Sequence, residues 1–140
     1  MDEARWEHFS HDADMGVRGI APSLAAAFEQ AALGLTAVVT DPSVIESHER
    51  VQLRCAADDT ELLLYDWLNA IIYEMATRKL LFARFSVEVQ DGELRATALG
   101  EPVDAARHQP AVEIKGATMT ELAVRQRDDG SWLAQCVVDV

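Results

Sequence analysis

Near its amino-terminal end the chain reads SHDADMGVRG, which places the ionisable side chains of His11, Asp12 and Asp14 close together. Two neighbouring carboxylates repel each other unless a cation or water compensates their charge. The stretch is therefore a candidate divalent-metal site, with exposure to water as the alternative. It is not an EF-hand, because a loop starting at Asp12 would need glycine at Val17 and glutamate at Ser23.

The other ionisable residues form no recognisable zinc or nucleophile motif. His8 and His11 have the spacing H-x-x-H, which on a strand directs the two rings to opposite faces. No C-x-x-C pair accompanies them, so a structural zinc site is disfavoured. Cys55 and Cys136 lie in apolar, alternating stretches, and we expect free thiols in a reducing compartment.

The carboxyl-terminal end of the sequence adds further oxygen ligands. It reads CVVDV, so Asp139 closes a predicted strand and Val140 would carry the terminal carboxylate. If this end lies beside Asp14, three carboxylates converge on one point. Such a set of oxygen donors suits a hard cation of the calcium or magnesium kind.

Two helices have the apolar periodicity needed to position these residues. The first follows Ser23, its predicted N-cap, and ends at Asp41-Pro42. The second begins at Asp58, whose spacing to Glu61 is that of a capping box, and continues in a broad apolar stripe. We expect both helices to pack against the sheet through their apolar faces.

Alternation of apolar and polar residues predicts the strands. They cover residues 51–55, 85–89, 94–98, 122–124 and 132–138, with shorter candidates at 6–9, 15–20 and 112–115. Asp91-Gly92 has the chemistry of a type I′ hairpin turn, and Asp129-Gly130 marks a second hairpin. The pattern predicts one α+β domain over residues 1–140, with two main helices packed on mainly antiparallel sheet.

The charge of the chain limits its partners. The 140 residues carry a formal net charge of −12, with 12 basic and 24 acidic side chains. Tight nucleic-acid binding requires clustered basic residues and is therefore not expected, whereas a cation or a basic protein surface suits this field. No apolar run approaches the roughly 20 residues of a membrane span, and the first residues do not resemble a secretory signal, so we expect a cytoplasmic protein.

Five segments, in the same order along residues 6–140, resemble motifs of the archease family. HDADMGVRG resembles its H-x-A-D-x-G motif, and LLYDWLNAIIYEM resembles its second-helix signature. GEPVDAARH resembles G-E-x-x-D-x-x-x-H, VEIKGAT resembles E-V-K-A-x-T, and VVDV resembles the closing D-I or D-V. Each motif is modest alone, but five in register are specific.

The resemblance implies a function in tRNA splicing and RNA repair. Archeases are accessory proteins of the RtcB-type RNA ligase, and they promote guanylylation of its active-site histidine and multiple turnover. The protein would thus be an activator without catalysis of its own. The resemblance also implies a divalent cation on Asp14, Asp139 and Val140, of which Ca²⁺ is expected and Mg²⁺ or Mn²⁺ are alternatives, and a functional lysine at Lys115.

Several points stay open at the level of sequence. Met119 and Thr120 stand where the family often has tyrosine and histidine, so any role of that histidine is lost. Four polar residues could contribute to the site or could be solvated: His11, Asp12, Asp66 and Asn69. A metal-dependent phosphohydrolase or nuclease, and a chaperone-like module for RNA-modifying enzymes, are the alternative functions.

Overall fold

The computed structural model describes residues 4–140, and it has the predicted α+β architecture. In chain order its elements are β1 (Arg5–His11), β2 (Asp14–Ala21), α1 (Leu24–Val39), the 3-10 helix η1 (Pro42–Val44), β3 (Glu49–Ala56), α2 (Thr60–Arg78), β4 (Leu80–Gln90), β5 (Glu93–Pro102), α3 (Ala105–His108), β6 (Gly116–Ala117), β7 (Ala123–Gln126) and β8 (Trp132–Asp139). Among these helices, none is long and apolar enough to cross a membrane.

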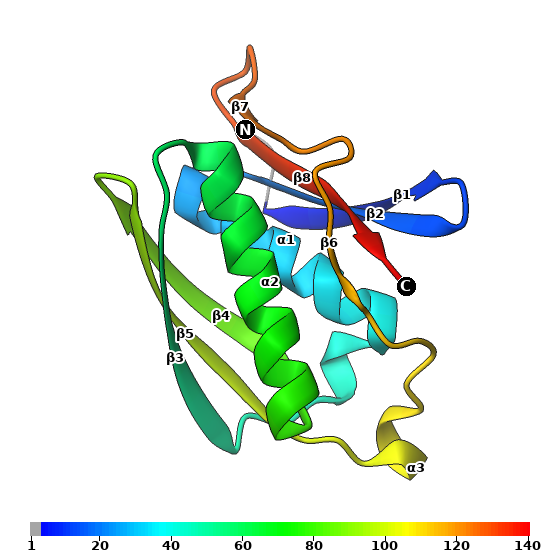
Figure 1. The fold of residues 1–140 in the computed structure, drawn as a ribbon. Coiled ribbons are helices and arrows are strands. Elements are labelled where there is room, and N and C mark those ends of the chain that lie inside the picture. Colours follow the sequence, from blue (N-terminus) through cyan, green and yellow to red (C-terminus); the bar gives the residue numbers. More distant parts are fainter. Residues whose placement is uncertain (1–3) are drawn as a thin grey trace.

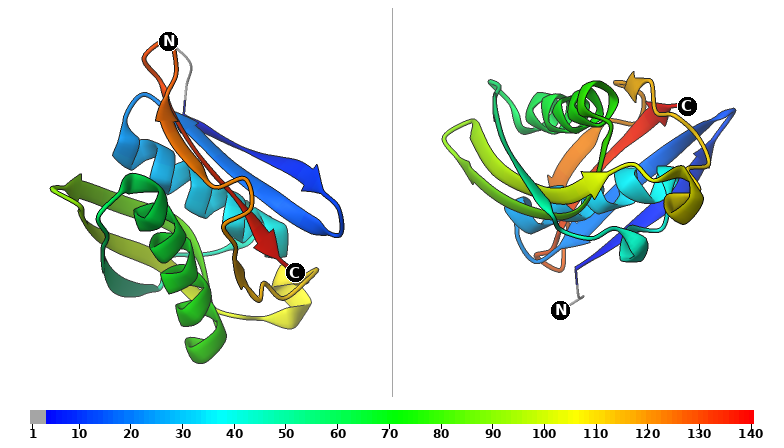
Figure 2. Two further views of the ribbon diagram at one scale, coloured as in Figure 1. Left: turned by 45° about the horizontal axis from the view of Figure 1, so that its top comes forward. Right: turned by 90° about the horizontal axis from the view of Figure 1, so that it is seen from below.

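The strands form two antiparallel sheets with α1 and α2 between them, whereas the short α3 lies at the periphery (Figure 1). The larger sheet has the order β1-β2-β8-β6, with β7 also paired to β8, and the smaller has the order β3-β5-β4. The views in Figure 2 show α1 between the two sheets and α2 beside it. The core therefore lies between the sheets and around α1.

Helix α1 is buried because its alanine-rich surface lets both sheets approach closely. Ala27, Phe28 and Ala31 are fully buried. On the facing strand, a Cβ at Gly19 would lie 2.2 Å from the carbonyl oxygen of Ala27, so only glycine fits there. Ser23 accepts a hydrogen bond from the Ala26 amide at 3.2 Å, which confirms the predicted N-cap.

Helix α2 starts one residue later than the sequence pattern predicted. Its N-cap is Asp59, whose carboxylate accepts a hydrogen bond from the Leu62 amide at 2.8 Å, so the assignment of Asp58 was wrong. Glu61 does not close a capping box and instead accepts from the Val124 amide of β7 at 3.4 Å. Trp67 fixes α2 against α1 by donating from Nε1 to the Phe28 carbonyl at 3.1 Å.

Both predicted hairpins are present, and one predicted strand is not. Asp91 and Gly92 have φ angles of 52° and 74°, as a type I′ turn between β4 and β5 requires. Strand β7 pairs with β8 as expected. Residues 112–115 are not a strand, because their alternation comes from burial of Ile114 in the core, and sheet pairing begins only at Gly116.

Both cysteines are free thiols, as the sequence indicated. Cys136 is buried in β8, and burial raises the pKa of its thiol to about 11. The pKa of Cys55 is also raised to about 11, by burial and, secondarily, by the charge of Asp66. Neither thiol is therefore ionised near neutral pH, and neither is a candidate nucleophile.

Candidate functional site

Three strands of the larger sheet begin or end at the same end of the sheet. Throughout, the sheet edge means this end, where the strands terminate, and not an outermost strand. Strand β2 begins at Asp14, β8 ends at Asp139, and the register pairs Met15 with Val138. Continuing this register by one residue sets Asp14 opposite Asp139, although the paired residues themselves end at Met15 and Val138. Opposed residues in an antiparallel sheet have Cβ atoms roughly 5 Å apart on the same face. The sheet thus brings together two carboxylates that are separated by most of the sequence.

These two carboxylates lie on the outer face of the sheet, away from the helices. Gly19 faces α1, and alternation along β2 therefore turns Asp14, Gly16 and Arg18 to the opposite side. Arg18 donates on that side to the side chain of Gln135, at 2.8 Å. The Asp14 and Asp139 carboxylates are accordingly placed where a ligand can reach them from outside.

Neither carboxylate has a partner among the residues that the structure describes. Within residues 4–140, the side chains of Asp14 and Asp139 make no hydrogen bond and no ion pair. The side chain of Val140 packs against the core, which fixes the main chain that follows Asp139. A set of oxygen donors with uncompensated charge is what a hard divalent cation requires, so the predicted residues fit Ca²⁺.

Lys115 reaches the same edge from the third strand end. Its amide donates to the carbonyl of Asp139 at 2.8 Å, one residue before β6 begins. Its side chain is exposed, and within the described residues it forms no ion pair. A cationic amine and two carboxylates are thus presented by adjacent backbone segments.

The first hairpin contains further polar residues, of which His11 is the strand partner of Asp14 in the β1–β2 register. Asp12 occupies the turn with φ of 52°, and its side chain is 94% exposed and lies 3.9 Å from the His11 ring. The Gly16 backbone makes a close approach to Phe9 and not to a ligand, because a Cβ at Gly16 would overlap the Phe9 ring. His8 contacts the Gly34 carbonyl of α1 at 2.8 Å.

Asn69 and Asp66 act on the helix side of the sheet. The Oδ1 atom of Asn69 accepts a hydrogen bond from the Ala117 amide at 2.9 Å and so holds β6 in place. Asp66 is exposed, and its charge influences Cys55 on β3. The sequence left both roles open. The structure places Asn69 Oδ1 beside Gly116, the residue paired with Asp139, where a Cβ would lie 3.6 Å from it.

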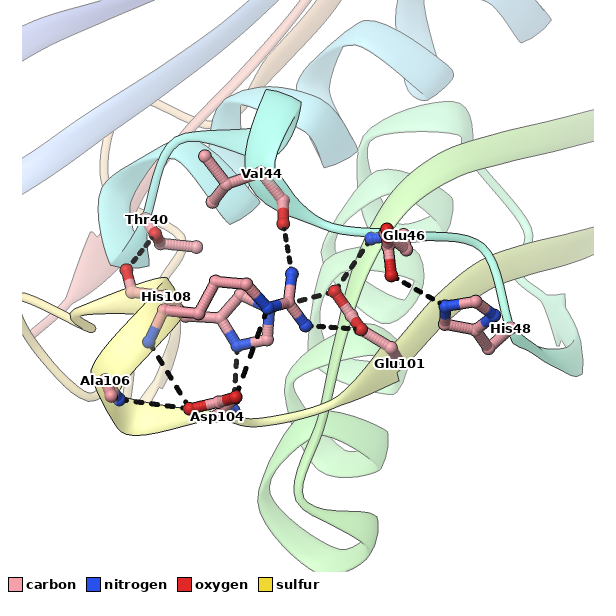
Figure 3. Close-up of polar contacts among 9 residues, drawn as sticks. Thr40, Val44, Glu46, His48, Glu101, Asp104, Ala106 and His108 are labelled. Atoms are coloured by element: carbon pink, nitrogen blue, oxygen red, sulfur yellow. Dashed lines mark hydrogen bonds and ion pairs between the residues drawn. The ribbon is translucent and has the colours of Figure 1, made fainter.

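A second polar cluster, not anticipated from sequence, surrounds Glu101 at the end of β5 (Figure 3). This side chain is almost fully buried, with a residue exposure of 4%. Its carboxylate accepts from the Arg107 guanidinium at 2.6 Å, from the Glu46 amide at 2.8 Å and from the His108 ring at 3.0 Å. The hydrogen bonds from Arg107 and from the Glu46 amide are the main causes that lower the pKa of Glu101 to about 2.

The hydrogen bonds of His108 define its tautomer. Its Nδ1 atom accepts from the Asp104 amide at 2.8 Å, so the ring proton is on Nε2 and is donated to Glu101. Asp104 in turn caps α3 by accepting from the Ala106 and Arg107 amides. The side chains of the GEPVDAARH segment therefore hydrogen-bond to one another and stabilise this part of the fold. The motif indicated the segment but not its contact with Glu46.

The sequence of the chain matches a known protein family along almost its whole length. The model of the Archease protein family (MTH1598/TM1083) matches residues 6–140. The curated protein archease of Pyrococcus furiosus is 36% identical over 140 residues, covering 97% of this chain and 99% of the relative. That of Thermococcus gammatolerans is also 36% identical, with the same coverage.

Solved structures agree with the sequence matches. The solution structure of Methanobacterium thermoautotrophicum protein 1598 superimposes with a TM-score of 0.84 at 30% identity, covering 96% of this chain and 98% of that one. The crystal structure of a Thermotoga maritima protein, described as an archease and possible chaperone, has a TM-score of 0.61 at 19% identity and 96% coverage of both chains, which supports the fold.

The fold and the paired strand ends define an α+β protein with two antiparallel sheets around its helices and an uncompensated anionic edge. The chain belongs to the archease family.

Proposed function

We propose that this protein is an accessory activator of an RtcB-type RNA ligase in tRNA splicing or RNA repair. It would promote guanylylation of the ligase and sustain multiple turnover, without catalysing a reaction itself. Membership of the archease family supports this partner. The observation that carries the proposal is the convergence of Asp14, Asp139 and Lys115 at one open sheet edge.

In this proposal a divalent cation, Ca²⁺ above all, binds the Asp14 and Asp139 carboxylates and a main-chain oxygen of Val140. The ion would supply positive charge where the sheet edge now has unbalanced negative charge. Lys115 is held next to this site by its amide, which donates to the Asp139 carbonyl, and its side chain has no ion-pair partner within the described residues. An ion and an amine together suit the phosphates of a nucleotide that is bound to the ligase, by electrostatic positioning.

The net charge of −12 suits a protein partner better than RNA. Phosphate backbones are attracted by clustered basic residues, which this chain lacks, and repelled by excess acid. The proposal therefore assigns all RNA contact to the ligase and restricts this protein to a contact with the ligase surface. No membrane partner is included.

A turnover assay tests the proposal directly. Purified ligase is mixed with a limiting or an excess amount of RNA ends, with GTP, and with or without this protein. We expect little effect on a single round by ligase already guanylylated, and a large increase in product once each ligase must react repeatedly. Equal multiple-turnover product with and without the protein would contradict the proposal.

Two controls separate this function from the alternatives. Hydrolysis of nucleotides or model phosphodiesters by the protein alone would favour a phosphohydrolase or nuclease. The description of the Thermotoga maritima relative as a possible chaperone motivates the second control. If the protein acts only by preserving folded ligase, an unrelated holding chaperone should replace it, whereas guanylylation should require this chain and its Asp14.

A further inference from the structure

Three potential metal-ligand atoms converge away from the sheet edge. The side chains of Glu46, His48 and Glu101 each offer one such atom, and these atoms all lie within 4.8 Å of one another. Glu46 and His48 belong to the segment between η1 and β3, whereas Glu101 lies at the end of β5. Figure 3 shows Glu46 and His48 on one side of the Glu101 carboxylate and His108 on the other. Arg107 also donates to this carboxylate, at 2.6 Å.

Glu101 is a fixed carboxylate with capacity for one more partner. A carboxylate has about four acceptor positions, and three are used by Arg107, His108 and the Glu46 amide. Its Oε2 atom takes two of these hydrogen bonds and Oε1 takes one, so one position on Oε1 is left. Because the side chain is buried and hydrogen-bonded, it needs no ordering to act as a ligand.

The backbones of the two exposed ligands are also fixed. The Glu46 amide is bound to Glu101 at 2.8 Å, and the His48 amide donates to the Gly100 carbonyl at 2.8 Å. Their side chains are more than half exposed and already contact each other, through His48 Nε2 and Glu46 Oε2 at 2.8 Å. Only side-chain rotations are then needed to direct both toward Glu101.

We propose that Glu46, His48 and Glu101 bind a divalent transition-metal ion such as Zn²⁺, with water completing its coordination. One imidazole nitrogen and two carboxylate oxygens are ligands that suit Zn²⁺ better than Ca²⁺. Ligand atoms at about 2.1 Å from a tetrahedral ion are roughly 3.4 Å apart, so the Glu46 and His48 side chains must rotate inward from positions in which the three atoms lie within 4.8 Å of one another. The bound ion would fasten the segment after η1 to β5 and α3.

The charges around the site favour moderate affinity. Two carboxylates balance the divalent ion, while the Arg107 guanidinium stays hydrogen-bonded to Glu101 and repels it. A neutral imidazole of His48, with one ring nitrogen free of its proton, is the form that binds the ion. His108 keeps its hydrogen bond to Glu101 and orients that carboxylate from behind.

The test compares exposed His48 with half-buried His11 by calorimetric titration with Zn²⁺ and, separately, with Ca²⁺. His48→Gln and Glu46→Gln should each weaken Zn²⁺ binding at least about tenfold and leave Ca²⁺ binding unchanged. His11→Gln is the matched control, because His11 is also beside a carboxylate, that of Asp12 at 3.9 Å. It should bind Zn²⁺ like the wild type.

A structural readout accompanies the titration. Paramagnetic Co²⁺ in place of Zn²⁺ should shift the NMR resonances of His48 and His108 and spare those of His11. Unchanged Zn²⁺ binding in both His48→Gln and Glu46→Gln would overturn the proposal, and so would an equal loss in His11→Gln. Neither result would affect the ligase proposal, whose cation site lies at the sheet edge and is assayed by turnover.

Discussion

Carboxylates lie in two contrasting regions of this protein. In one region protein donors compensate the negative charge, and in the other they do not. At the end of β5, Glu101 is surrounded by donors from Arg107, His108 and a backbone amide. At the edge of the larger sheet, Asp14 and Asp139 have no hydrogen-bond or ion-pair partner within residues 4–140. The first arrangement stabilises the fold, whereas the second leaves charge for a ligand to neutralise.

This comparison predicts opposite effects on stability, and Glu101 should give the largest change. Glu101→Gln replaces an acceptor with an amide that cannot satisfy all three donors, of which the His108 ring is buried. We expect the melting temperature to fall by about 5 °C or more. Asp14→Asn in metal-free buffer is the control, and it should keep or slightly raise the melting temperature because repulsion from Asp139 is relieved. Equal losses in the two variants would contradict the distinction.

Acid should remove the contribution of Glu101 selectively. Its folded-state pKa is about 2, below the ordinary value of 4.5, so its stabilising effect is complete above about pH 4.5 and is lost as the pH falls toward 2. The difference in melting temperature between wild type and Glu101→Gln should therefore shrink over this window. A difference that stays constant from pH 6 to pH 3 would show that the Glu101 carboxylate is not stabilised by its donors.

At the sheet edge the large effect should be on ligand binding and not on stability. Asp14→Asn keeps the size of the side chain but removes one charge from the proposed cation site. We expect Ca²⁺ affinity to fall about a hundredfold, or roughly 2.7 kcal/mol, and multiple turnover of the ligase to be lost. Calcium calorimetry and the turnover assay measure this. Wild-type affinity in the variant would remove Asp14 from the site.

A tag at the carboxyl-terminal end should have a smaller effect on the same site. A tag fused directly after Val140 leaves only a neutral amide carbonyl at this position and adds chain beside the ion, while both aspartates remain. We expect at least about a tenfold loss of Ca²⁺ affinity, or roughly 1.4 kcal/mol. The same tag placed before Met1 is the matched control. Equal affinities of the two tagged proteins would exclude Val140 as a ligand.

Substitution of Lys115 should lower ligase activation while changing folding and Ca²⁺ binding least of all the variants. Lys115→Ala is expected to preserve folding and Ca²⁺ binding, since the side chain is exposed and no residue among those described pairs with it. Ligase activation should decrease, and Lys115→Arg should restore it only in part, because a planar guanidinium differs from a compact ammonium. A lower melting temperature with unchanged activation would instead assign Lys115 a structural role.

Local patterns in the sequence predicted the presence of helices and turns more accurately than the residues at which the helices begin. Helix α1, its Ser23 cap and the turn at Asp91-Gly92 follow from local chemistry and were confirmed. The Asp58 cap was wrong by one residue, because two successive aspartates are chemically equivalent as caps until the helix axis is fixed. The four-residue α3 is too short to produce a periodic signal.

The sites differ in what sequence could reveal. The motifs indicated Asp14, Asp139, Val140 and Lys115, and the structure places these residues at one edge, although their metal and lysine roles stay predictions. The Glu101 cluster could not be predicted in full, because its contact with the Glu46 amide joins residues 55 positions apart. Such a contact depends on packing of β5 against the segment before β3, which no local pattern encodes.

The position of β8 between β2 and the pair β6 and β7 has a consequence for synthesis. During translation the β1-β2 hairpin emerges early, but its open edge must wait for a strand that emerges more than a hundred residues later. Unpaired strand edges of this kind promote aggregation, and pairings distant in sequence form slowly. A ribosome-bound chain that stops before β8 should therefore lack the Asp14–Asp139 pair and expose the β2 edge to proteases and neighbouring chains, so that cation binding would report completed synthesis.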